Sequence, residues 1–210
     1  MRKHSHSSEG SPLRCYENRF CSSLDPDTRR RLCQACTKST YAANSKATMN
    51  FYRHFLVVEG LCLTKRFRTS FVYRQGDFVV TPHPDESREV NLVDVSFSEG
   101  VDYDTDLDFI TMTTLAFFDK GEIDALLDDP GFLRASYDNL QDLNAHIVAY
   151  LIGVGSSSAH DAVRFVLKYC AHNGIDHLTH EQIARLTGLS RTTVTSLMRE
   201  VALAEPELLR

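Results

Sequence analysis

Residues 178–201, LTHEQIARLTGLSRTTVTSLMREV, contain two short amphipathic patterns on either side of Gly188. Apolar residues recur there at three- to four-residue spacing, which predicts two helices joined by a tight turn. Thr179, with Gln182 three residues later, predicts a capping box at the start of the first helix, and Ser190 predicts the cap of the second. Gly188 supplies the permissive backbone that such a turn requires. The stretch therefore predicts a helix-turn-helix.

The second of these helices exposes short hydroxyl and cationic side chains. Groups of this kind reach phosphates and base edges in a major groove. A helical hairpin that only packs within an all-α domain has the same periodicity, but it does not require the glycine, the cap and the hydroxyl-rich face together. We therefore predict DNA binding through nine residues: Thr179, Gln182, Ser190, Arg191, Thr192, Thr193, Thr195, Ser196 and Arg199.

Length and composition limit the class of protein. A chain of 210 residues with 42% apolar content predicts two modest domains. The net charge of −5 argues against a purely electrostatic nucleic-acid binder, and residues 156–210 balance six Lys and Arg against six Asp and Glu. Specificity must then come from positioned contacts. No apolar run is long enough to span a membrane and no hydrophobic signal core begins the chain, so we expect a cytoplasmic protein.

Residues 1–13 are polar and predict a mobile leader, and a cysteine-containing stretch follows it. Asp25 or Asp27 can cap a short helix with Pro26 near its first turn, and this helix carries Cys33 and Cys36 as neighbours. We expect ordinary thiols there and no tightly bound cofactor, because free cysteine behaves as a small apolar residue. The alternative is a zinc or iron–sulfur site, which needs converging thiolates. Its ligands would be Cys15, Cys21, Cys33 and Cys36.

From residue 41 to 118 the period of the apolar residues changes to two. FLVVEGLCLTKRF (residues 55–67) predicts two strands that meet at Glu59 and Gly60, and Gly76 with Asp77 predicts a second turn. Further strands are expected at residues 89–96 and 109–117. Several short strands with Gly, Pro and Asp between them predict a small antiparallel β-roll, or jelly-roll.

Four aspartates alternate within this region. At strand spacing they share one face, which could chelate a hard cation such as calcium. No EF-hand pattern accompanies them, so we expect a solvated acidic face that blocks edge-to-edge strand pairing. The residues are Asp102, Asp104, Asp106 and Asp108.

A long helical pattern covers residues 132–153, with apolar positions every seven residues and a second column between them. A seam kept for three heptads requires a partner, and the simplest partner is a second copy of the chain. Asn144, beside the seam, could set its register or contact an effector. The alternative to a dimer is a single helix packed on the roll. Residues 153–158, GVGSSS, predict a hinge. The predicted dimer interface is Leu133, Leu140, Leu143, Ile147, Tyr150 and Val154.

EQIARLTGLSRTTVTSLMREV resembles the DNA-reading segment of the Crp/Fnr transcription regulators, strongly over residues 156–201, and FLVVEGLCLTKR followed by YRQGDFVV is similar to their β-roll. The resemblance implies an α+β chain with a leader (1–13), a β-roll effector-sensing domain (14–129), a dimerisation helix and hinge (130–155) and a helix-turn-helix domain (156–210). It implies double-stranded DNA with a palindromic operator, a second copy of the chain and a small-molecule effector as partners, with RNA polymerase as a further partner.

The chain departs from that family in several places. No Lys or Arg lies between residues 97 and 118 to hold a cyclic phosphate, so we expect an effector other than cyclic AMP. The cysteine spacing does not match the cluster-binding Fnr branch, and the β-hairpin wing expected after Val201 is absent or replaced. Arg191 matches a family position that contacts phosphate or guanine. Thr192 replaces the usual Glu and Ser196 an Arg, so the operator should differ from the family's.

The sequence favours a dimeric, effector-controlled regulator of this type that is not an enzyme. No nucleophile, base and orienting group are arranged together, and no HExxH or glycine-rich phosphate loop is present. Two other hypotheses remain open. One is a metal, iron–sulfur or thiol redox-sensing regulator that uses the N-terminal cysteines, and the other is a β-roll ligand-binding protein that does not bind DNA.

Overall fold

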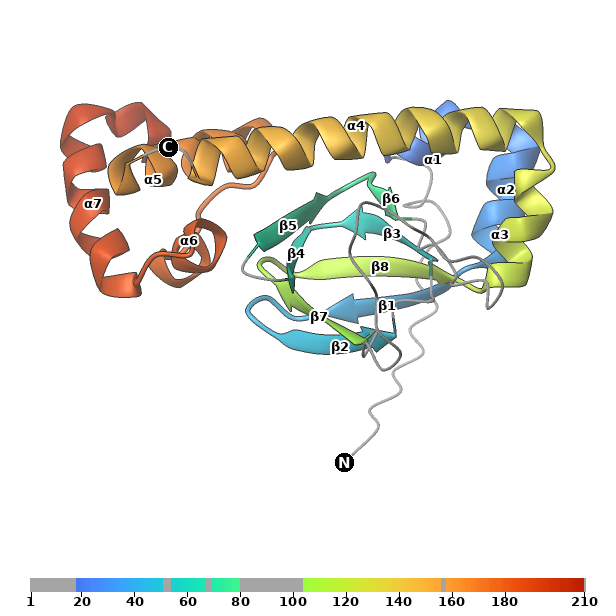
Figure 1. The fold of residues 1–210 in the computed structure, drawn as a ribbon, viewed down its shortest axis with the longest axis horizontal. Helices are drawn as coiled ribbons and strands as arrows, with labels where there is room; N and C mark the ends of the chain where they lie inside the picture. Colours follow the sequence, from blue (N-terminus) through green and yellow to red (C-terminus); the bar gives the residue numbers. More distant parts are fainter. Residues whose placement is uncertain (1–17, 51–53, 67–68, 80–103, 156–157, 210) are drawn as a thin grey trace, which may run out of the picture.

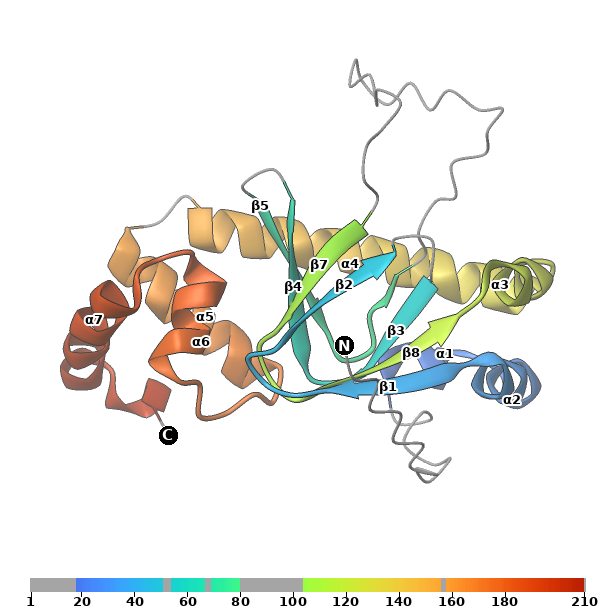
Figure 2. The ribbon, with the colours of Figure 1, turned by 90° about the horizontal axis from the view of Figure 1, so that it is seen from below.

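The computed structural model describes residues 18–50, 54–66, 69–79, 104–155 and 158–209. Two antiparallel four-stranded sheets form a roll, one long helix runs along the roll, and a group of shorter helices lies at one end of that long helix (Figure 1). Figure 2 shows the long helix beside both sheets from a second direction. The predicted α+β class with an antiparallel β-roll and a C-terminal helix-turn-helix is therefore confirmed.

Each sheet is built from strands that are distant in the chain. The first sheet has the order β1 (Thr37–Tyr41), β8 (Thr113–Phe118), β3 (His54–Glu59) and β6 (Phe78–Val79). The second has the order β2 (Lys46–Asn50), β7 (Asp104–Phe109), β4 (Leu61–Arg66) and β5 (Thr69–Arg74). Apolar side chains from both sheets fill the space between them, as the alternation of the strands requires.

The chain crosses from one sheet to the other at Gly60. The predicted turn is present, but β3 and β4 belong to different sheets and do not pair with each other. Gly60 has a φ of +93°, and a Cβ there would lie 2.4 Å from the carbonyl oxygen of Met112. Only glycine fits this crossing, because it needs both a left-handed backbone and the space of the missing side chain.

Two strand predictions need correction. The strand expected at residues 109–117 is wrong as a single element, because β7 ends at Phe109 and β8 begins only at Thr113. The residues between them turn the chain, and the Ile110 N–H donates to the Leu61 carbonyl oxygen at 2.9 Å. The strand expected at residues 89–96 lies outside the described residues.

The acidic row is only partly solvated. Asp106 is exposed and accepts a hydrogen bond from Thr48, whereas Asp108 is buried and its Oδ1 lies 3.2 Å from Lys46 Nζ. The expectation of a uniformly exposed acidic face is therefore wrong for Asp108, which is buried and pairs with Lys46 of the neighbouring strand β2. Asp102 lies outside the described residues, and of Asp104 only the backbone is described.

The helices begin where the sequence places their caps. In α2 (Pro26–Ala35), Asp25 Oδ1 accepts from the backbone N–H groups of Asp27 and Thr28. Of the helices within the described part of the chain, none has the length and hydrophobicity that crossing a membrane requires. The others are α1 (Arg19–Ser23), α3 (Lys120–Leu127), α4 (Pro130–Gly155), α5 (Ala159–His172), α6 (His180–Thr187), α7 (Arg191–Ala204) and the 3-10 helix η2 (Pro206–Leu209).

The helices after residue 158 do not form an isolated core. Leu61, Val72 and Ile110 of the roll pack in the same apolar cluster as Val166 of α5 and Ile183 of α6. The C-terminal helices are thus docked on the second sheet, at the end of α4.

Candidate nucleic-acid interface

The helix-turn-helix forms as its caps predict. The Gln182 N–H donates to Thr179 Oγ1 at 3.3 Å, and the Thr179 N–H donates back to Gln182 Oε1 at 2.7 Å. Gly188 ends α6 with a φ of +73°, in the left-handed region. Ser190 Oγ then accepts from the Thr193 N–H at 3.1 Å and begins α7. These contacts fix the angle between the two helices locally.

Apolar packing holds α7 against the helices beneath it. Val194 and Val201 are completely buried, and they join Ile183, Ala184 and Leu186 of α6 in one cluster. Burying a side chain of this size stabilises a fold by about 1.5–3 kcal/mol. The outward side of α7 is therefore presented on a rigid support.

That outward side is hollowed. A cavity of about 500 Å³ follows α7. Arg191 and Arg199 are both exposed, and neither forms an ion pair with any residue that the structure describes. Two guanidinium groups with short hydroxyls between them can meet phosphates and base edges together. Five of the nine predicted residues line the cavity: Arg191, Thr192, Thr195, Ser196 and Arg199.

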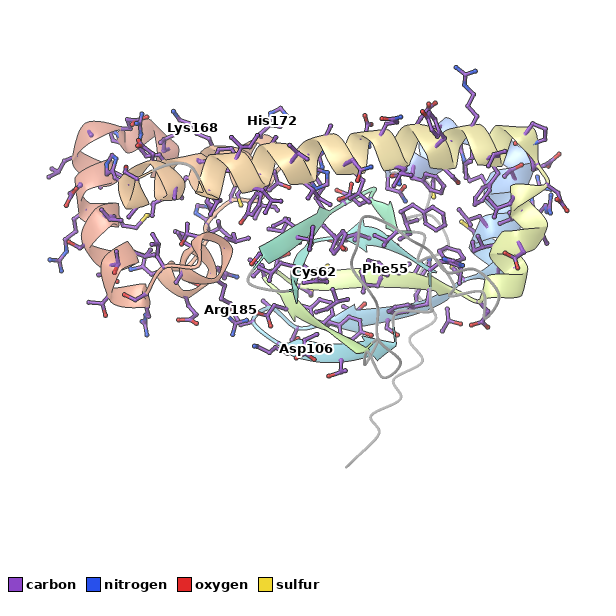
Figure 3. The ribbon with its side chains drawn as sticks, in the orientation of Figure 1. Phe55, Cys62, Asp106, Lys168, His172 and Arg185 are labelled. Carbon is purple, nitrogen blue, oxygen red and sulfur yellow. The ribbon has the colours of Figure 1, made fainter. Side chains whose placement is uncertain are left out.

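Carboxylates neutralise the cations of the neighbouring helices instead. Glu205 contacts both Arg164 and Lys168 of α5, and the hydrogen bond from Arg164 lowers the pKa of Glu205. On α6, Glu181 Oε1 lies 3.6 Å from Arg185 Nε. Lys168 and Arg185 lie on opposite sides of the C-terminal helices in Figure 3. Although residues 156–210 carry equal numbers of acidic and basic side chains, the arginines of that segment without ion pairs among the described residues thus lie on α7.

The four predicted DNA-binding residues that do not line the cavity form hydrogen bonds within the protein. Gln182 is buried, and its Nε2 donates to the Ile110 carbonyl oxygen in the turn between β7 and β8, so it faces the roll rather than solvent. The prediction of a DNA contact at Gln182 is wrong for this arrangement of the chain. The hydroxyls of Ser190 and Thr193 hydrogen bond to each other at 2.8 Å, and Thr179 Oγ1 bonds to Gln182.

Helix α4 has one buried and one exposed side. Leu143 and Tyr150, predicted as interface residues, are only 6% and 1% exposed and pack inside the chain. Their assignment to the dimer interface is therefore corrected. The exposed apolar stripe of α4 consists of Leu133, Tyr137, Leu140, Val148 and Ile152, each at least half exposed.

On the outward side of α4, the second column at heptad spacing lies one residue further along the chain than predicted. Leu133, Leu140, Ile147 and Val154 remain on the outward or half-buried side, as predicted. Their companions at heptad spacing are Tyr137, Asn144 and Leu151 instead of Ser136, Leu143 and Tyr150, because the latter three turn toward the roll.

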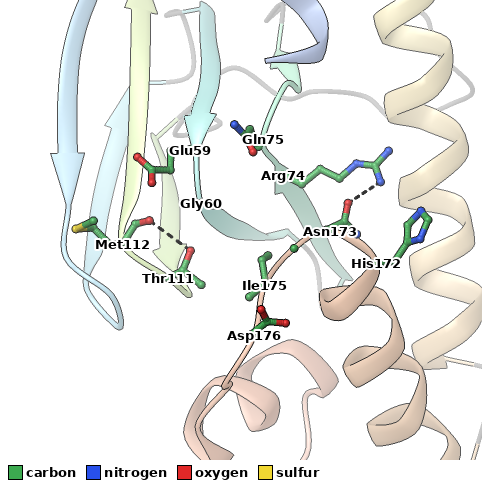
Figure 4. A pocket seen from close by; sticks show the side chains of 11 residues that line it. Glu59, Gly60, Arg74, Gln75, Thr111, Met112, His172, Asn173, Ile175 and Asp176 are labelled. Carbon is green, nitrogen blue, oxygen red and sulfur yellow. Dashed lines mark hydrogen bonds between the residues drawn. The ribbon is translucent and has the colours of Figure 1, made fainter. Parts of the chain in front are cut away.

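Several side chains that sequence reasoning missed connect α4, the roll and the C-terminal helices. The Tyr150 hydroxyl donates to the Leu186 carbonyl oxygen at 2.7 Å, and burial raises the pKa of Tyr150. Arg74 Nη1 donates to Asn173 Oδ1 at 2.9 Å. This bond lies beside a pocket of about 580 Å³ between the roll and the C-terminal helices (Figure 4). No local pattern marks such residues, since their partners are far away in the sequence.

A buried carboxylate lies beneath α4. Asp77, which the sequence assigned only to a turn, is fully buried, and burial raises its pKa. His146 Nε2 of α4 lies 3.5 Å from Asp77 Oδ2, and Arg19 Nη2 lies 3.4 Å from Asp77 Oδ1. Arg74 contacts Asp77 as well as Asn173. One carboxylate thus contacts α1 and α4 directly, and it reaches Asn173 at the end of α5 only through Arg74.

Two of the N-terminal cysteines are neighbours in the structure, since Cys36 Sγ donates to the Cys33 carbonyl oxygen at 3.3 Å. Cys21 is buried on α1, Cys33 is half-buried on α2, and Cys36 follows that helix as its cap. Among residues that the structure describes, no three His, Cys, Asp or Glu side chains are placed to hold a metal ion. Cys15, the fourth ligand of the alternative metal site, lies outside the described residues.

Solved structures with a similar fold include bacterial regulators. The c-di-GMP-responsive global regulator CLP of Xanthomonas campestris superposes with a TM-score of 0.58 at 16% identity, covering 86% of this chain and 93% of CLP. A transcriptional regulator of the Crp/Fnr family from Eubacterium rectale gives 0.56 at 12% identity over 89% and 87%. FixK2 of Bradyrhizobium japonicum gives 0.54 at 13% identity over 80% and 85%.

By sequence, no protein-family profile and no curated protein matches the chain. The structural likeness at this low identity concerns the fold, and it extends over both the roll and the C-terminal helices.

Proposed function

We propose that this chain, which has the fold of the Crp/Fnr regulators, is a dimeric, sequence-specific DNA-binding transcription regulator. The observation that carries the proposal is the rigid outward side of α7, with two arginines free of ion pairs among the described residues and hydroxyls between them. Duplex DNA offers the complementary surface, because its phosphates attract the guanidinium groups and its major groove admits a helix.

The exposed stripe of α4 supports the dimer. An apolar stripe on a surface helix indicates an interaction site when it is contiguous, and a second copy offers a stripe of matching register. Asn144 lies within the heptad pattern at a position where a polar side chain fixes register in coiled coils. A twofold dimer would present its two α7 helices to successive major grooves about 34 Å apart, and its operator would be a palindrome.

An effector other than cyclic AMP would act on the junction between the roll and the C-terminal helices. The contacts of Tyr150 with Leu186 and of Arg74 with Asn173 hold those helices in the observed place. A small molecule shifts such an arrangement only if it binds one arrangement more tightly than another. If no candidate molecule changes the operator affinity, the protein is a constitutive binder.

Selection of bound duplexes from random DNA tests the proposal. We expect enrichment of a palindrome whose half-sites are one helical turn apart, and its sequence should depend on Arg191 and Ser196. The selection is repeated with cyclic di-GMP, to which the Xanthomonas neighbour responds, and with and without reducing agent. Failure to enrich any sequence under all these conditions would favour the ligand-binding protein that does not bind DNA.

A further inference from the structure

Two hydrogen bonds determine which nitrogen of His180 carries a proton. His180 is the first residue of α6, and its Nδ1 lies 3.0 Å from Oγ1 of Thr195 on α7. The Thr195 hydroxyl has one proton, which it donates to the Arg191 carbonyl oxygen at 2.9 Å. Thr195 Oγ1 is therefore an acceptor toward His180. It follows that Nδ1 of His180 carries the hydrogen.

The other ring nitrogen, Nε2, is the atom that His180 offers to a partner. The side chain is half-buried, and Nε2 makes no hydrogen bond with the described residues and is not among their buried polar atoms. Because Nδ1 is already protonated, Nε2 is a lone-pair acceptor in the neutral ring and a charged donor in the imidazolium. Phosphate oxygens only accept hydrogen bonds, so while Nδ1 carries the hydrogen of the neutral ring, Nε2 can donate to a phosphate only as part of the imidazolium.

His180 borders the candidate DNA face through Thr195, which lines the cavity on α7. The charged groups on its own helix, Glu181 and Arg185, pair with each other. On α7 the charged side chains are Arg191, Arg199 and Glu200, and on α5 both Arg164 and Lys168 are occupied by Glu205. Within the described residues no carboxylate forms an ion pair with His180. The anion that the ring would meet is therefore the DNA backbone.

We propose that His180 is a proton-dependent phosphate contact, placed in that role by Thr195. The inference rests on the proposed DNA-binding function and adds a regulation of the same site by pH. Below the pH at which the imidazole protonates, the complex gains a charge-assisted hydrogen bond; above it, the Nε2 lone pair faces phosphate oxygens and opposes binding. Operator affinity should therefore rise as the pH falls.

The test is fluorescence anisotropy of the selected operator at about pH 6 and about pH 8, each over a range of salt concentrations. For the full-length protein we expect roughly three- to tenfold tighter binding at the lower pH. The dependence of log affinity on log salt should be steeper there by about 0.9, the value for one phosphate contact. In His180→Gln, which keeps a polar side chain but cannot titrate, both differences should disappear, whereas the exposed His172→Gln on α5 should retain them.

Nitrogen-15 NMR of the free protein provides a test without DNA. We expect the Nδ1-protonated tautomer of His180 in the unmodified chain and its loss in Thr195→Val, which removes the acceptor. An Nε2-protonated ring in the unmodified chain would overturn the inference. So would equal pH and salt dependence in His180→Gln and the unmodified chain, and that result would leave the proposed function intact. Absence of binding to any duplex would remove both.

Discussion

Helices α7 and α4 each present an exposed side, but the two sides differ in chemistry. The α7 side offers Arg191, Arg199 and hydroxyls, which water solvates well. The α4 stripe offers aliphatic and aromatic side chains, whose exposure costs about 25 cal/mol per Å² of apolar surface until a partner covers it. The comparison indicates that α7 selects a polar, anionic partner through hydrogen bonds, whereas α4 requires an apolar partner.

The largest effect is expected from charging the α4 stripe. The double variant Leu140→Glu and Ile152→Glu would place like charges across a symmetric seam, so the dimer should dissociate. Operator affinity should fall by roughly 100-fold or more, because one α7 helix must then bind alone. Analytical ultracentrifugation measures the mass, and anisotropy measures the affinity.

Ala145→Glu is the control for that variant, since it adds a glutamate at an exposed position of α4 outside the heptad columns. It should leave both the mass and the affinity near those of the unmodified chain. If the double variant instead keeps the full dimer mass, the α4 stripe is not the interface and another surface must join the copies.

The next largest effect is expected on α7. Arg191→Ala should lose about 1–3 kcal/mol of specific binding without changing the mass or the free energy of unfolding, because the side chain is exposed. Arg134→Ala removes an exposed arginine from α4 and should leave DNA binding unchanged. Anisotropy with the operator and with a scrambled duplex separates specific from general binding. An unchanged affinity for the operator would remove Arg191 from the contacts.

The sequence predicted the α7 side better than the α4 side for a physical reason. The caps and the turn depend on residues three or four apart. The residue types at Thr179, Gly188 and Ser190 therefore predict where α6 begins, where it ends and where α7 begins. The two sides of α4 are both apolar, and heptad spacing alone does not say which column meets the roll. Tyr150 was assigned outward although its hydroxyl bonds to Leu186, a residue 36 positions away.

The same reason explains the errors at Gln182 and Asp108. Each residue type is usually exposed, and each is buried here beside a partner distant in the sequence: Gln182 bonds to Ile110 in the turn, and Asp108 pairs with Lys46 of β2. Long-range contacts of this kind leave no periodic signal. The assignment of β3 and β4 to different sheets also depends on long-range contacts. The sequence predicts the turn between them but not the strands with which each one pairs.

A smaller effect should separate the rigidity of α7 from its contacts. Ser190→Ala removes the acceptor of the Thr193 N–H and should lower the free energy of unfolding by about 1 kcal/mol. Ser196→Ala, an exposed change in the middle of the same helix, removes no cap and should not lower it. Urea unfolding followed by circular dichroism measures both. Equal stability of the two variants would mean that the cap does not support the helix.

The smallest effect is expected at Leu203, which at 87% is the most exposed large apolar side chain among the described residues. It lies near the end of α7 without the heptad neighbours that surround Leu140, and scattered apolar residues on a surface need no partner. Leu203→Gln should therefore change the free energy of unfolding by less than about 0.5 kcal/mol and leave the mass unchanged, whereas Leu140→Gln should weaken the dimer. If Leu203→Gln weakened the dimer as much as Leu140→Gln, the interface would include the end of α7, and the two helices could no longer be assigned to separate partners.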